Sequence, residues 1–201
     1  MEYEGLSRDD LDNVRALNRA WLELDGSAEL RLSAMRLERL AATPFLLFSF
    51  YEHDDARWRR LLGEQRQQDM LGHEPVISTE LRQLQAAGLG FLWGLARRNP
   101  YVARIISGAP LHWCEQVAAS TLVQVIECAR FKMIEPRFAD RTSLKRRLMG
   151  GGSAQKREMR IFAQIGALQS MLTSGQLSQY TRLPAAACRI PQTGRQVADK
   201  V

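Results

Sequence analysis

The chain has 201 residues, of which 45% are hydrophobic and 25% charged, and it carries a formal net charge of +6. This length and composition are typical of one compact globular domain or two small ones and exclude a disordered or fibrous chain. The three cysteines, Cys114, Cys128 and Cys188, form no C-x-x-C pair, and the chain shows neither a secretory signal nor about 18 consecutive apolar residues. We therefore expect a cytoplasmic protein that has no disulfide framework and makes no membrane contact.

The net charge of +6 hides a gradient along the chain. Residues 1–129 contain 14 basic and 18 acidic residues, a net charge of −4, whereas residues 130–201 contain 14 basic and 4 acidic residues, a net charge of +10. The densest basic cluster comprises Lys145, Arg146, Arg147, Lys156, Arg157 and Arg160. Such a cluster attracts the phosphates of a nucleic acid or an acidic partner protein. A solvated helix face is the alternative interpretation.

Apolar residues that recur every three or four positions predict a series of helices in the first part of the chain. The first helix begins after Ser7 and ends near Gly26, and Asn18 is expected to point away from its apolar face. A second helix is predicted over 27–42. It ends there because the residue before Pro44 avoids helical geometry. The aromatic run 45–51 is predicted to be extended.

Four more helical stretches follow. The first begins at Asp54 and continues to about residue 71, and the second runs from about 78 to 98 as the buried centre of the fold. Glycine in a helix interior costs roughly 1 kcal/mol relative to alanine, so the glycines between 88 and 94 predict that another helix passes close there. A short helix to Ile106 and a longer stretch over 111–131, bent near Ser120, complete this part.

The glycine triplet is predicted to divide the chain into a core and a C-terminal helix. We expect a helical core domain over 1–149, a glycine hinge at 150–152, a C-terminal helix over 153–174 and a flexible tail over 175–201. The helix is predicted to bind a partner helix or the core through an apolar face of Met159, Phe162, Ile165, Leu168 and Leu172. Together these elements predict an all-α protein of about seven or eight helices.

One pattern occurs twice in the chain. Leu37, Ala41, Leu46 and Phe50 correspond to Val125, Ala129, Ile134 and Phe138 at a constant shift of 88 positions, and an Asp-started basic helix follows each copy. Two pseudo-repeated helical halves would explain the match, and a chance alignment of two amphipathic helices is the alternative.

The second copy, 121–129 followed by Arg137-Phe138-Ala139-Asp140, resembles the central part of FlhD, the helical subunit of the bacterial flagellar master transcription regulator. The first copy, 37–43 with Phe50 and Asp54-Asp55, is similar, as is 18–22. The resemblance implies an all-α bacterial protein that dimerises and acts on promoters through a DNA-contacting partner subunit.

The sequence contains no recognisable catalytic motif. His112, Cys114 and Glu115 form a tight cluster, but helical neighbours one and two positions apart point to different sides, so no Cys-His dyad is expected. No histidine stands in an E-x-x-H or H-E-x-x-H pattern, and neither a P-loop nor a dinucleotide fingerprint is present. We therefore expect no catalytic residue, no metal and no cofactor.

These features favour a non-enzymatic regulatory protein that acts by binding another protein as an oligomer, with a basic C-terminal third that contacts nucleic acid. A helical adaptor or chaperone-like protein of a motility or secretion apparatus, without DNA contact, is the alternative. An enzyme whose site is assembled from distant residues is a third hypothesis, and convergence of His53, His112 or Glu115 in a deep pocket would favour it.

Overall fold

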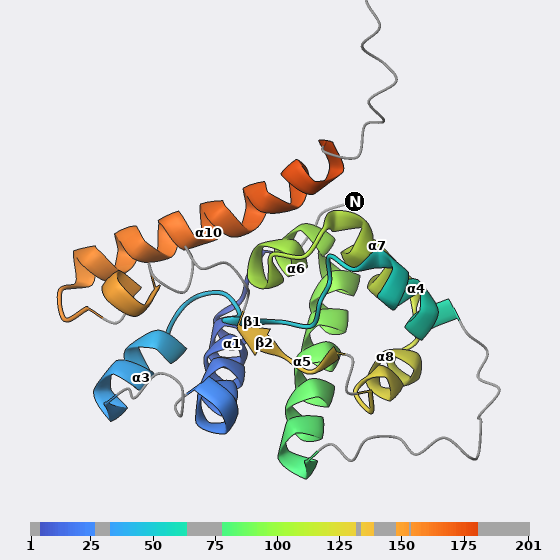
Figure 1. Ribbon diagram of the computed structural model, residues 1–201, viewed down its shortest axis with the longest axis horizontal. Coiled ribbons are helices and arrows are strands. Elements are labelled where there is room, and N and C mark those ends of the chain that lie inside the picture. The colour runs from blue at the N-terminus through green and yellow to red at the C-terminus, as the bar shows by residue number, and fades with distance from the viewer. Residues whose placement is uncertain are drawn as a thin grey trace, which may run out of the picture.

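The computed structural model describes residues 5–26, 33–63, 78–131, 134–138, 148–152 and 154–180. Within these residues the fold is all-α, as the sequence predicts, apart from two short strands (Figure 1). None of the described helices combines the length and the apolar content needed to cross a membrane.

The helices follow the predicted order. They are α1 (Arg8–Trp21), α3 (Ala34–Ala41), α4 (Asp55–Gly63), α5 (Thr79–Arg98), α6 (Pro100–Ser107), α7 (Leu111–Ala119), α8 (Leu122–Cys128) and α10 (Arg157–Tyr180). The strands are β1 (Phe48–Ser49) and β2 (Arg137–Phe138), and π-helical turns occupy Leu22–Gly26 and Leu148–Gly152. The predicted helical residues 27–32, 64–71 and 140–147, and the tail residues 181–201, lie outside the described residues.

Side-chain caps set several helix starts. Ser7 and Asp10 form a capping box at α1, and the Ser78 hydroxyl accepts a hydrogen bond from the Leu81 N–H at α5. Thr121 caps α8 in the same way, since its hydroxyl accepts from the Gln124 N–H. The bend predicted near Ser120 is therefore a complete break between α7 and α8.

Helix α5 forms the centre of the molecule and packs against α1, α6, α7 and α8 (Figure 1). Its buried side chains include Leu84, Leu89, Leu92 and Leu95. Close approaches occur at two of the glycines of this helix: at Gly88 the neighbour is an aromatic ring of the extended segment, and at Gly90 it is Leu122 of α8, whose Cδ1 would lie 4.0 Å from an added Cβ. A Cβ added at Gly88 would lie 2.7 Å from Cζ of Phe50.

The extended segment between α3 and α4 is held by α1. The Asn18 side chain is fully buried, contrary to the sequence prediction, and its amide nitrogen donates to the carbonyls of Ala41, Thr43 and Phe45. Its oxygen accepts from the Leu47 N–H. The backbone N–H and C=O groups of a buried segment outside a helix need such hydrogen-bond partners, because water cannot reach them.

The two similar segments of the sequence meet at a strand pair. β1 and β2 are antiparallel, with Phe48 opposite Phe138 and Ser49 opposite Arg137. In each copy a short helix leads through a fully buried aliphatic residue, Leu46 or Ile134, into the strand. This arrangement agrees with two pseudo-repeated halves, and the residues predicted to form the helix after the second strand lie outside the described residues.

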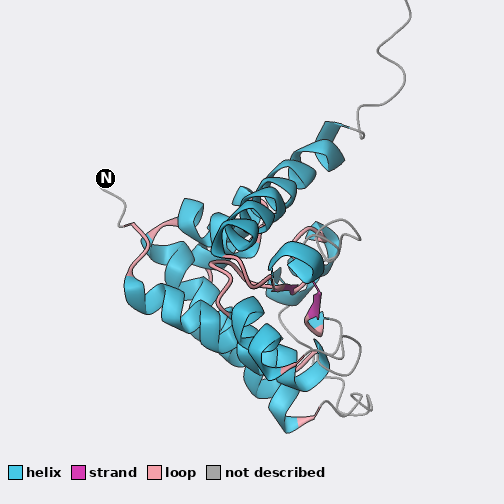
Figure 2. Ribbon diagram, turned by 90° about the vertical axis from the view of Figure 1, so that its left-hand side faces the viewer, coloured by secondary structure: helices cyan, strands magenta, loops and turns pink. Residues whose placement is uncertain are grey.

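Helix α10 lies across the molecule next to α6, and its C-terminal part extends past the other helices (Figures 1 and 2). It begins later than predicted, at Arg157, and continues to Tyr180. Its buried Met171 covers Gly108 in the turn between α6 and α7, where φ is 73° and an added Cβ would lie 2.8 Å from Cε of Met171. The glycine triplet forms part of the π-helical turn packed against α10, and its role as a hinge stays a prediction.

Candidate nucleic-acid interface and partner surface

The predicted partner face of α10 divides into an exposed and a covered part. Met159, Phe162 and Ile165 are 54%, 73% and 50% exposed, whereas Leu168 packs against the core and Leu172 is half-buried. Ile161, which the sequence analysis omitted, is also exposed at 42%. We call Met159, Ile161, Phe162 and Ile165 the apolar patch of α10. Such residues gathered on two turns of one helix are typical of a contact surface.

The predicted basic cluster is described only at its C-terminal half, because residues 145–147 lie outside the described residues. Lys156 and Arg157 are exposed at the start of α10. Arg160 is half-buried, and its guanidinium donates to the carbonyls of Ala154 and Gln155 at 3.0 and 2.9 Å. Arg160 therefore holds the turn before α10 as well as adding positive charge.

Two residues of that cluster line a hollow with residues from the other half of the chain. Arg157 and Arg160, together with Arg15 of α1 and Arg39 of α3, line a space of about 420 Å³. The rest of the lining comprises Met35, Glu38, Ala42, Ile161 and Gln164. We call this space the arginine hollow. The distribution of charge along the sequence does not predict this hollow, because Arg15 and Arg39 belong to residues 1–129, whose net charge is −4.

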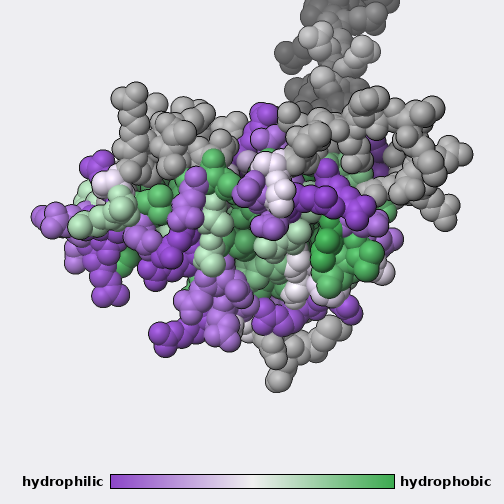
Figure 3. All heavy atoms as spheres, turned by 90° about the horizontal axis from the view of Figure 1, so that it is seen from below, coloured by the Kyte–Doolittle hydropathy of each residue, from purple (hydrophilic) through white to green (hydrophobic). Residues whose placement is uncertain are grey.

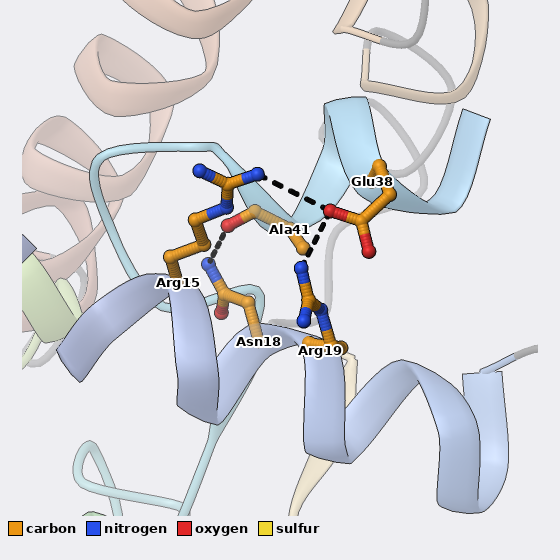
Figure 4. Close-up of polar contacts among 5 residues, drawn as sticks. All are labelled: Arg15, Asn18, Arg19, Glu38 and Ala41. Carbon is orange, nitrogen blue, oxygen red and sulfur yellow. Dashed lines mark hydrogen bonds and ion pairs between the residues drawn. The ribbon is translucent and has the colours of Figure 1, made fainter. Parts of the chain in front are cut away.

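Glu38, the carboxylate in the lining of the arginine hollow, is shared by two arginines of α1. Arg15 and Arg19, one helical turn apart, reach the same oxygen of Glu38 at 3.2 and 2.6 Å, and Asn18 between them points to the Ala41 carbonyl (Figure 4). The hydrogen bonds from Arg19 and Arg15 lower the pKa of Glu38. The carboxylate is therefore ionised at neutral pH and already engaged.

A second hollow, of about 720 Å³, lies between α1 and α5. Its lining is largely apolar and includes Leu17, Leu84 and Phe91, with Glu23 and Glu80 as its charged members. Apolar residues reach the surface on the face of the molecule seen from below (Figure 3). Neither of the two hollows is lined by His53, His112 or Glu115, the residues whose convergence would favour an enzyme.

Cys114 and His112, the residues considered as a catalytic dyad, lie in different surroundings. Cys114 is fully buried, and burial, with the nearby Glu52 carboxylate, raises the pKa of its thiol to about 12. His112 is exposed and pairs with Asp55 of α4 at 2.6 Å. A thiol with this pKa is almost wholly protonated at neutral pH, so Cys114 is unsuited to act as a nucleophile. Among the described residues, no three His, Cys, Asp or Glu side chains form a group that could hold a metal ion.

Glu52 is a buried carboxyl that the sequence analysis did not single out. It accepts hydrogen bonds from the Phe50 N–H, at 3.0 Å, and from the Ser49 hydroxyl. Burial raises its pKa, and these hydrogen bonds offset only part of the effect. Trp58 of α4 closes the same turn, since its indole N–H donates to the carbonyls of Phe50 and Tyr51. The hydrogen-bond partners of Glu52 are therefore residues of its own turn, which indicates a structural role.

Comparisons of this chain with protein-family models, curated proteins and solved structures find no match.

Proposed function

We propose that this protein is a non-enzymatic regulator that acts by protein-protein association, with a second copy of the chain bound at the apolar patch of α10. The observation that carries the proposal is the composition of this helix. From Ile161 to Tyr180 it contains no Asp, Glu, Lys or Arg, and Phe162 and Ile165 stand exposed on it. A helix that only bordered solvent would carry charges on its outer face.

A second copy suits this patch on electrostatic grounds. A two-fold symmetric contact brings each residue near the same surface of the other copy, so a charged patch would face like charge. The uncharged stretch avoids that repulsion. Burial of exposed apolar area stabilises such a contact by roughly 25 cal/mol per Å² before the costs of association.

The second part of the proposal is that the basic C-terminal third contacts nucleic acid. Support comes from the net charge of +10 over residues 130–201 and from the exposure of Lys156 and Arg157 at the start of α10. Contacts from lysine and arginine to phosphates increase affinity without reading sequence, and each contact releases counterions. In this proposal a partner protein supplies sequence readout.

Binding of the purified full chain to a fluorescent random duplex, measured by anisotropy over a range of salt concentrations, tests the nucleic-acid part. We expect steeply salt-dependent binding that replacement of Lys145, Arg146 and Arg147 by alanine weakens and makes less salt-dependent. Absence of binding at low salt would overturn this part and favour the adaptor without DNA contact. The association part is tested independently by the mass of the protein in solution.

A further inference from the structure

The arginine hollow has an excess of positive charge that the described residues do not neutralise. Four arginines and one glutamate leave its lining with a formal charge of +3. Glu38 is already shared by Arg15 and Arg19. Arg39, Arg157 and Arg160 have no carboxylate partner in the part of the chain that the structure describes. A concave surface of one charge sign concentrates the field and attracts anions.

The contacts made by two of these arginines fix their position and leave their charge intact. The Arg39 guanidinium lies 3.1 Å from the sulfur of Met35, and Arg160 donates to two backbone carbonyls. All of these acceptors are neutral. Each guanidinium has five N–H donors in a planar fork, so both retain donors for an anion.

We propose that the arginine hollow binds a phosphate group of a nucleic-acid backbone, so that α1 and α3 contribute to the interface together with α10. Arginine forks match phosphate oxygens in pairs, and the hollow brings arginines from three separate elements to one place. Lys156, exposed beside Arg157, continues the positive surface beyond the hollow. The inference rests on the proposed nucleic-acid contact and extends it to the half of the chain whose net charge is negative.

Substitution of Arg39 by glutamine separates this interface from one confined to the C-terminal third. Arg39 has no described ion pair to lose, and it lies outside the basic cluster found in the sequence. In a duplex titration against salt, R39Q should reduce the slope of log Kd against log salt by about one unit, the effect of one lost phosphate contact. R15Q tests the same hollow from α1, since Glu38 retains Arg19 as a partner.

The matched control is R82Q, which removes the same charge from an exposed position in the first turn of α5, outside the hollow. The salt slope reflects the number of phosphates contacted, and the proposed interface includes no contact from Arg82, so R82Q should keep the wild-type slope. Circular dichroism and thermal unfolding establish that each variant is folded.

Three outcomes would overturn the inference. If the wild-type chain binds duplex and both R39Q and R15Q keep its salt slope, the hollow makes no phosphate contact, although the proposed function stands. If the wild-type chain does not bind duplex, the phosphate contact of the hollow and the proposed nucleic-acid contact are both wrong. Calorimetry with adenosine monophosphate distinguishes a free ligand, because tight binding that R39Q abolishes without any effect on duplex affinity would assign the hollow to a small phosphate.

Discussion

The side-chain oxygen of Asn18 accepts a hydrogen bond from the backbone N–H of Leu47 at 2.9 Å, across 29 positions of sequence. The same side chain donates to the Phe45 carbonyl at 2.9 Å. One amide thus ties α1 to the segment that leads into β1. Because α1 and α3 both border the arginine hollow, this buried amide also fixes the geometry of the candidate interface.

Replacement of Asn18 by leucine should lower the free energy of unfolding by at least about 2 kcal/mol, because it leaves buried backbone groups without partners. Urea unfolding followed by circular dichroism measures the loss. Asp12→Leu, at an exposed position of the same helix that lines neither hollow, is the control and should change stability by no more than about 0.5 kcal/mol. Equal effects of the two substitutions would show that the Asn18 contacts contribute nothing.

Gly88 and Gly94 of α5 should respond oppositely to alanine. At Gly88 the new Cβ would lie 2.7 Å from the Phe50 ring, and overpacking of this kind costs about 1 to 3 kcal/mol. At Gly94 no atom beyond the local helix backbone and the adjacent residues lies within 4 Å of the added Cβ, so the higher helix propensity of alanine should stabilise the protein by up to about 1 kcal/mol. Thermal unfolding of the two variants gives the comparison. A stabilised G88A would contradict the packing of α5 against Phe50.

Glu52 should make the protein less stable as pH rises. Burial raises its pKa in the folded state above the value of 4.5 expected for the unfolded chain. Below that value both states are protonated, and as pH rises toward the folded-state pKa the unfolded state loses its proton first, so folding is progressively disfavoured. Above the folded-state pKa the effect is constant.

E52Q removes this ionisation and retains a neutral acceptor for the Phe50 N–H. The free energy of unfolding of E52Q minus that of the wild type should therefore increase from pH 4 upward and then level off. Chemical denaturation at a series of pH values measures the difference. A difference that falls with pH would mean that Glu52 is stabilised as a carboxylate.

The sequence predicted those features that depend on local pattern. The helix starts after Ser7 and Ser78 and the non-helical run that contains β1 can be recognised within a few residues, because short-range geometry determines them. Asn18 could not be placed, since a polar residue within an amphipathic pattern is ordinarily exposed and its partners lie more than 20 positions away. For the same reason the sequence did not reveal that Arg15 and Arg39 lie near Arg157.

The exposed apolar patch was only partly predicted. The three- and four-residue period identified Met159, Phe162 and Ile165 as one face with Leu168 and Leu172, but the period alone does not tell which part of a face meets the core. Packing of Ala167 and Met171 against the core determines this, and Met159, Phe162 and Ile165 stay exposed nearer the start of α10.

Sedimentation velocity of the wild type and two variants tests whether the protein associates through the apolar patch of α10. F162E places a charge in the apolar patch, and V123E places one at a similarly exposed apolar side chain on α8, 67% exposed against 73% for Phe162. We expect the wild type and V123E to sediment as an oligomer and F162E as a monomer. A monomeric wild type, or an F162E variant that retains the mass of the oligomer, would show that the apolar patch of α10 does not join two copies of the chain.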